Sequence, residues 1–123
     1  LRVSARRDFS EALFSTGIPF MGQDGHELFV EQLKRVMGVS AGVRRFGSAA
    51  LDLAYVAAGR YIGYYEFQIN SWDCLAGIAM VRETGGWTND FLSNEGLKTG
   101  NPVLAASPGT KEAMQNLFAA AGH

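Results

Sequence analysis

Residues 64–86 combine the end of an aromatic strand, a tight turn and an almost wholly apolar helix. Residues 63–67 are rich in aromatic side chains that suit a pleated surface, so they predict a strand. Residues 74–81 are apolar on every face, which is typical of a helix covered on both sides, and Gly85-Gly86 ends it. A strand that leads directly into a buried helix indicates an α/β sheet.

Two carboxylates flank this turn. Asp73 falls in the first turn of the apolar helix, where the helix dipole stabilises a negative charge, and Glu66 falls near the end of the strand. Ligands of α/β sheets bind at the carboxyl ends of the strands, so this position predicts a site. The alternatives are a helix-capping role for Asp73 and a plain surface role for Glu66.

The remaining elements follow from periodicity and turn residues. We expect further strands at 12–15, 43–46, 87–91 and 103–107, helices at 24–37 and 49–58, and a last helix starting at Ser107-Pro108. Residues 92–101 read as a polar loop. In helix 24–37 the predicted buried stripe is Phe29, Leu33, Val36 and Met37, with Glu31, Gln32, Lys34 and Arg35 facing solvent.

This order of elements predicts the fold class. Three strand–helix units precede two strands and a helix, which favours an α/β fold with one mixed, mostly parallel five-stranded sheet and helices on both faces. The connection between the last two strands is too short for a helical crossover, so they should be antiparallel neighbours. We expect residues 1–123 to form a single domain.

Composition narrows the classes of partner. A net charge of −1 gives no reason to expect nucleic acid or an anionic membrane. The single cysteine, Cys74, argues against a disulfide framework and fits a reducing compartment, so we expect a cytoplasmic protein. No apolar run is long enough to span a bilayer.

Small residues mark the turn before helix 49–58. Ser48 is a good N-cap residue, and Gly47-Ser48-Ala49 would leave backbone N–H groups open to an anion or a polar oxygen. The alternative is a plain strand-to-helix turn. Arg44-Arg45, just before it, could clamp a phosphate or form a pair that faces solvent or another subunit.

These motifs together resemble one family. Trp72-Asp73, the following Ala76-Gly77 and the run Arg-Glu-Thr-Gly-Gly at 82–86 are similar to the C-terminal signature of the inositol monophosphatase family. Residues 12–20 and 43–66 resemble the family as well. The departures from the family pattern are at Gln68, Asn70, Cys74, Leu75 and Thr84.

The resemblance implies a magnesium-dependent phosphatase that acts on inositol monophosphate or a related sugar phosphate. It implies that Asp73 is a ligand of Mg²⁺ and that Glu66 hydrogen-bonds a hydroxyl of the substrate. It also implies that Gly47, Ser48 and Ala49 provide backbone donors around the phosphorylated small molecule. Magnesium prefers several oxygen ligands in an octahedron, so one carboxylate is not a complete site.

The resemblance further implies that this chain is the C-terminal half of such an enzyme. The family's first half carries an acidic D-P-x-D-G-[ST] motif and a Glu-Glu pair before it, and neither occurs here. We therefore expect the 123 residues alone to be inactive and the complete enzyme to be a homodimer. Alternative substrates are histidinol phosphate, fructose 1,6-bisphosphate and a 3′-phosphoadenosine nucleotide, and another alternative is a non-catalytic association module.

Overall fold

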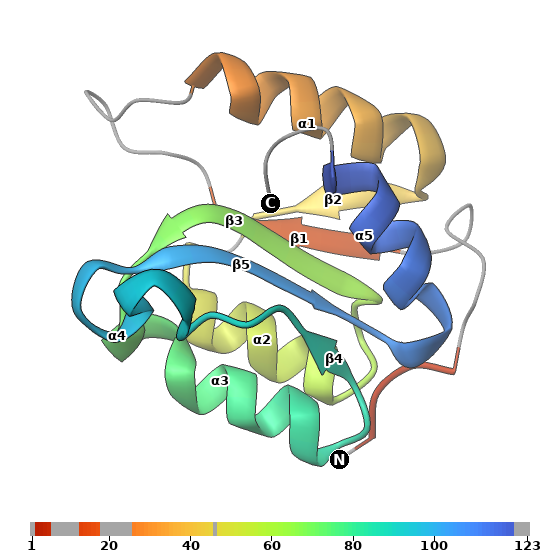
Figure 1. The fold of residues 1–123 in the computed structure, drawn as a ribbon. Coiled ribbons are helices and arrows are strands. Elements are labelled where there is room, and N and C mark those ends of the chain that lie inside the picture. The colour runs from red at the N-terminus through yellow and green to blue at the C-terminus, as the bar shows by residue number, and fades with distance from the viewer. Residues whose placement is uncertain (1, 6–12, 18–25, 46, 120–123) are drawn as a thin grey trace.

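A five-stranded sheet forms the centre of the molecule (Figure 1). The computed structural model describes residues 2–5, 13–17, 26–45 and 47–119. The strands are β1 (Leu13–Thr16), β2 (Gly42–Arg44), β3 (Gly63–Ile69), β4 (Trp87–Thr88) and β5 (Asn101–Ala106). The helices are α1 (His26–Val39), α2 (Ala49–Ala57), α3 (Ser71–Glu83), α4 (Gly96–Thr99) and α5 (Lys111–Ala119), with single turns of 3-10 helix at Ser93–Glu95 and Pro108–Thr110.

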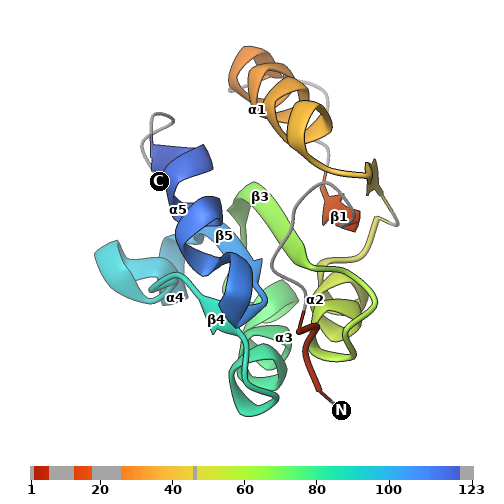
Figure 2. The ribbon, with the colours of Figure 1, turned by 90° about the vertical axis from the view of Figure 1, so that its right-hand side faces the viewer.

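The strand order is β2-β1-β3-β5-β4. Strands β2 and β3 pair with β1 in parallel, β5 pairs with β3 antiparallel, and β4 pairs with β5 antiparallel. Four of the five strands therefore run in one direction, and only β5 runs against them. Helices α1 and α5 cover one face of the sheet and α2 and α3 cover the other (Figures 1 and 2). The predicted fold class is confirmed, as is the antiparallel pairing of the last two strands.

Each face of the sheet has its own hydrophobic core. Because successive side chains of a strand point to opposite faces, Tyr64 packs under α2 and α3, whereas Tyr65 packs under α1 and α5. Leu53, Val56, Cys74 and Val81 of the two helices join the Tyr64 core. Within the described residues, no helix combines the length and the apolar character needed to cross a membrane.

Helices α2 and α3 approach each other closely at Gly77. A side-chain carbon at position 77 would lie 2.5 Å from the Cβ atom of Leu53 on α2. Glycine at this point lets the two helices pack side by side, and their N-terminal ends then lie together at one edge of the layer. This edge is where the predicted site residues fall.

The predicted orientation of helix α1 is partly wrong. Gln32 is fully buried and Met37 is 60% exposed, although the pattern placed Gln32 in solvent and Met37 in the core. The helix buries Phe29, Gln32 and Val36, because it packs on the sheet beside α5 and shares a core with Met114 of that helix. This rotation could not be read from α1 alone.

Boundaries after α3 also differ from the prediction: β5 covers Asn101–Ala106 rather than 103–107. Strand β4 ends at Thr88 because the Asn89 side chain bonds to β5 instead, donating to the Pro102 carbonyl and accepting from the Leu104 N–H, both at 2.9 Å. The predicted polar loop at 92–101 contains helix α4. The Ser71 hydroxyl donates to the Leu97 carbonyl at 2.9 Å, so this short helix is tied to the start of α3.

Candidate functional site

The N-terminal ends of α2 and α3 enclose a cavity of about 340 Å³. Its lining consists of the turn before α2, the end of β3 and the start of α3: Gly47, Ser48, Ala49, Ala50, Ile69, Trp72 and Asp73. Four of the five residues predicted for the site therefore line one cavity. Glu66 is the exception and lies on β3, the strand that ends at the lining residue Ile69.

The turn before α2 is shaped by Gly47 and Ser48. Gly47 has φ +79°, a left-handed conformation that side chains disfavour, and no described atom lies within 4 Å of the position where its Cβ would stand. The Ser48 hydroxyl accepts from the Leu51 N–H at 3.3 Å, so the predicted N-cap is confirmed. The first N–H groups of a helix have no partners within the helix. Ala49 and Ala50, which carry two of these groups in α2, line the cavity.

Asp73 occupies the first turn of α3, as predicted, and its side chain is exposed. Its N–H donates to the Asn70 carbonyl at 3.1 Å, which fixes the backbone of the turn. Within the described part of the chain, no side chain bonds to its carboxylate. The group is thus placed to accept an external cation or a hydrogen-bond donor from the cavity.

Glu66 is held in position on β3 by Tyr64. The Tyr64 hydroxyl donates to Oε1 of Glu66 at 2.8 Å. Partial burial raises the pKa of the Glu66 carboxyl and the charge of Asp73 raises it further, while the Tyr64 hydrogen bond opposes the shift. Glu66 shares the face of β3 that α2 and α3 cover, and Asp73 lies in the first turn of α3, so the two predicted acids lie on the same side of the sheet.

Asp52 is an acidic residue that sequence reasoning did not assign to the site. It lies in the first turn of α2, is 1% exposed, and its Oδ1 atom has no hydrogen-bond partner among the described residues. Burial raises the pKa of this carboxyl from 3.8 to about 6, the charge of Glu66 adds to the rise, and the Ser15 hydroxyl lowers it. The only signal for Asp52 in the sequence was one acid in an otherwise apolar helix.

Asp52 should make folding pH-dependent. Its folded pKa lies above its unfolded value, so its contribution to stability is fully present below pH 3.8 and is lost as the pH rises through about 6. We expect Asp52→Asn to stabilise the chain at pH 8 by up to about 3 kcal/mol and to have little effect at pH 4. Urea unfolding at both pH values measures the difference. Asp90→Asn, at an exposed acid, is the matched control. An equal effect of Asp52→Asn on the free energy of unfolding at both pH values would contradict the prediction.

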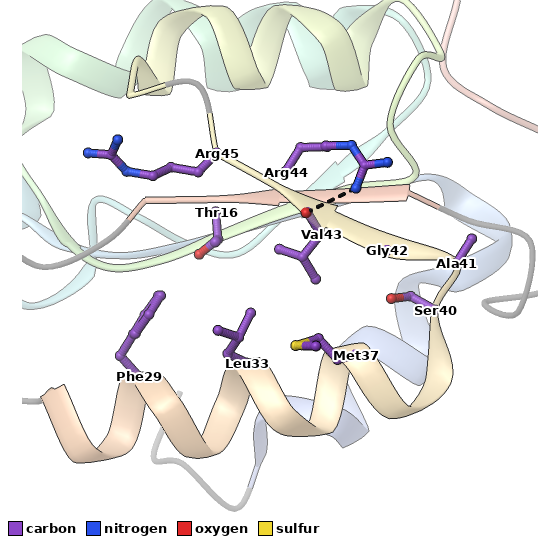
Figure 3. Close-up of a pocket in the computed structure, with 10 residues that line it drawn as sticks. All are labelled: Thr16, Phe29, Leu33, Met37, Ser40, Ala41, Gly42, Val43, Arg44 and Arg45. Atoms are coloured by element: carbon purple, nitrogen blue, oxygen red, sulfur yellow. Dashed lines mark hydrogen bonds between the residues drawn. The ribbon is translucent and has the colours of Figure 1, made fainter.

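A second cavity, of about 470 Å³, lies between α1 and the edge strand β2 (Figure 3). Phe29, Leu33 and Met37 of α1 face Val43 across it, while Arg44 and Arg45 lie on the other side of the strand from α1. The Arg44 guanidinium donates to the Val43 carbonyl of its own strand at 3.2 Å. Neither arginine lines the cavity that holds Asp73, so the phosphate-clamp alternative receives no support from the structure.

The described residues meet the requirements of a magnesium site only in part. Asp73 supplies an exposed carboxylate of the type that Mg²⁺ prefers. Across residues 2–5, 13–17, 26–45 and 47–119, no three His, Cys, Asp or Glu side chains are grouped to hold a metal ion. A magnesium site that included Asp73 would therefore need further ligands from outside this part of the chain.

Comparison with known proteins agrees with the fold and the motifs. The sequence profile of the inositol monophosphatase family matches residues 1–122. The chain is 50% identical over 107 residues to the inositol-1-monophosphatase of Rhizobium meliloti (strain 1021), covering 87% of this chain and 38% of that protein. It is 44% identical over 106 residues to the Nus factor SuhB of Pseudomonas aeruginosa, covering 84% of this chain and 39% of the relative.

The same similarity is seen in three dimensions. The crystal structure of the extragenic suppressor protein suhB from Bartonella henselae superposes with a TM-score of 0.84 at 39% sequence identity, covering 95% of this chain and 45% of that chain. In each of these comparisons the chain spans less than half the length of the protein that it matches.

Proposed function

Because this chain belongs to the inositol monophosphatase family, we propose that it is the substrate-binding half of a magnesium-dependent phosphomonoesterase. The proposed substrate is inositol monophosphate or a related sugar phosphate. The observation that carries the proposal is the single cavity that joins Asp73 with the N-terminal end of α2. Such a cavity offers a carboxylate ligand to a cation and, beside it, backbone N–H groups to the phosphate that the cation would bind.

Each residue of the cavity then has a role. Asp73 would hold Mg²⁺, which when bound neutralises phosphate charge and activates a water molecule. The backbone N–H groups of Gly47, Ser48 and Ala49 would orient the phosphorylated substrate, and Glu66 would accept a hydrogen bond from a hydroxyl of its alcohol part. The recognition of two different parts of one molecule favours a phosphate ester of a polyol.

The remaining magnesium ligands would come from a second half of the protein. Leu51, Trp72 and Met80 leave 40%, 76% and 36% of their surface exposed on the outer face of α2 and α3. Ala76 and Ala79 are exposed on the same face of α3, since positions 72, 76, 79 and 80 recur at helical spacing. We call these five residues the outer face, and we propose that the second half packs on it and completes the site.

The substrate can be tested directly on the complete protein, meaning this chain joined to the half that we propose. Phosphate release should require magnesium and should be fastest with inositol monophosphate. Histidinol phosphate, fructose 1,6-bisphosphate and a 3′-phosphoadenosine nucleotide are the comparison substrates. Faster hydrolysis of any of these would reassign the substrate while keeping the reaction.

A non-catalytic association role is the second candidate. It is favoured by the relatives that are named Nus factor SuhB, which are 40% identical in Escherichia coli and 44% identical in Pseudomonas aeruginosa. In that case the complete protein would lack phosphatase activity with every substrate of the panel. A protein that hydrolyses an ester and also associates with a partner would combine both roles.

Glu66→Gln should weaken substrate recognition and leave the magnesium requirement unchanged. A lost hydrogen bond to a charged group costs about 1.5–3 kcal/mol, so kcat/KM for inositol monophosphate should fall about tenfold to a hundredfold. Steady-state kinetics at varied substrate and varied magnesium separate the two effects. Glu83→Gln, at an exposed acid near the end of α3, is the matched control. A changed magnesium requirement with unchanged substrate preference would reverse the roles of Glu66 and Asp73.

A further inference from the structure

Tyr64 holds the Glu66 carboxylate in a defined position. Tyr64 and Glu66 stand two residues apart on β3, so their side chains share the face that carries α2 and α3. Tyr64 is 0% exposed and its ring is part of the core under those helices, which fixes the position of its hydroxyl. The hydroxyl is committed to one carboxylate oxygen, Oε1, at 2.8 Å.

The backbone of Gly17 also borders the Glu66 carboxyl group. It follows β1, whose Thr16 pairs with Tyr65 of β3. A Cβ atom at position 17 would fall on the Glu66 carboxyl group, closer than any real contact allows. The φ angle of Gly17 is not in the left-handed region, so alanine could adopt this backbone conformation. The glycine is therefore required here for space, and a substitution would test the space alone.

A second acid, Asp52, acts on the Glu66 carboxylate. Asp52 is buried on α2, and the partly buried Glu66 lies on the face of β3 that α2 and α3 cover, so two like charges repel in a setting less polar than water. Without a donor and a close-fitting wall, the Glu66 side chain would be free to turn away from Asp52 into other rotamers. The Tyr64 hydroxyl binds Oε1 and the Gly17 backbone lies against the carboxyl group, and both oppose that turn.

We propose that Tyr64 and Gly17 are positioning residues that hold the Glu66 carboxylate with Oε1 engaged and Oε2 available to a hydroxyl of the substrate. The inference rests on the proposed function, because it takes Glu66 to bind the alcohol part of a phosphate ester. It goes further by assigning the selectivity for hydroxyl-bearing substrates to two residues outside the cavity.

The test compares two substrates in the complete protein: inositol monophosphate, and p-nitrophenyl phosphate, which has no alcohol hydroxyl. Tyr64→Phe should lower kcat/KM for inositol monophosphate about tenfold, mainly through KM. The same variant should change turnover of p-nitrophenyl phosphate less than about threefold, since hydroxyl recognition is not used there. Gly17→Ala should shift the ratio of the two substrates in the same direction.

Matched controls separate positioning from folding. Tyr65→Phe removes the same hydroxyl on the opposite face of the sheet, and Gly38→Ala adds the same methyl group where no described atom lies within 4 Å. Neither should change the substrate ratio. A readout without turnover is the carbon-detected NMR signal of the Glu66 carboxyl in this 123-residue chain. It should move in Tyr64→Phe and Gly17→Ala and stay in place in both controls.

The outcomes distinguish this inference from the proposed function. If Glu66→Gln leaves the substrate ratio unchanged, the hydroxyl-binding role of Glu66 fails and the inference fails with it. If Glu66→Gln shifts the ratio while Tyr64→Phe and Gly17→Ala do not, the function stands and the positioning role is overturned. Equal losses on both substrates in Tyr64→Phe would also overturn it, because the effect would not act through hydroxyl recognition.

Discussion

Asp73→Asn should remove at least 99% of the phosphatase activity of the complete protein, since a loss of a few kcal/mol of charge stabilisation corresponds to about a hundredfold or more in rate. The amide has the same shape as the carboxylate but lacks the negative charge that a magnesium ligand contributes. Asp73 is exposed and no described side chain bonds to it, so the fold should not depend on it. Phosphate release at saturating magnesium measures the loss.

The control for this variant is Asp90→Asn, which makes the same chemical change at an exposed acid after β4, away from the cavity. It should retain nearly all the parental activity. Thermal unfolding should give the same midpoint for both variants and the parent. Near-normal magnesium-dependent turnover by Asp73→Asn would remove this residue from the metal site and leave only its position at the helix start.

The isolated 123-residue chain should hydrolyse no phosphate ester, and it should self-associate. Magnesium gives up its hydration shell reluctantly, so one carboxylate is a poor site for it. The outer face of α2 and α3 is apolar and exposed, and a contiguous patch of this kind promotes association. Sedimentation over a range of concentrations, together with an assay with magnesium and inositol monophosphate, checks both parts.

A pair of substitutions locates the association. Met80→Lys places a charge on the outer face and should shift the chain toward monomer, whereas Leu97→Lys on α4 should not, although Leu97 is 60% exposed. A monomeric parental chain with metal-dependent turnover would show that the site is complete within these residues. It would also show that the outer face does not need to pack against a second half of the protein.

The sequence allowed the central part of this fold to be predicted because its signals are local. The aromatic strand, the apolar helix and the Gly85-Gly86 ending lie within one segment, and residues 63–67 fall inside the strand that the structure shows. The short connection between β4 and β5 likewise fixed their antiparallel pairing. In each case neighbouring residues carried the information.

The errors arose where a distant element decides the outcome. Gln32 is buried because α5, far along the chain, lies beside α1. Strand β4 is short because the Asn89 side chain bonds to β5 rather than to solvent. A helical wheel or a strand propensity contains neither partner, so the pattern alone could not have given these results.

The residues of the candidate site also separate into those that local sequence predicts and those that depend on a distant strand. Asp73 and the Gly47-Ser48-Ala49 turn could be selected from their motifs, and the cavity joins them. The alternation of β3 could also have paired Tyr64 with Glu66, since residues two apart share a face. Gly17 could not have been found, because its contact with Glu66 depends on the pairing of β1 with β3.

The exposure of Trp72 has an optical consequence. The chain has two tryptophans, and they report on different places. Trp72 is 76% exposed in the cavity wall next to Asp73, whereas Trp87 is partly buried at the sheet edge beneath the Lys111 ammonium, 5.9 Å from its ring centroid. Intrinsic fluorescence therefore contains a solvent-sensitive component that originates at the site itself. Docking of another protein segment, or entry of a ligand, could be followed at this residue without any added label.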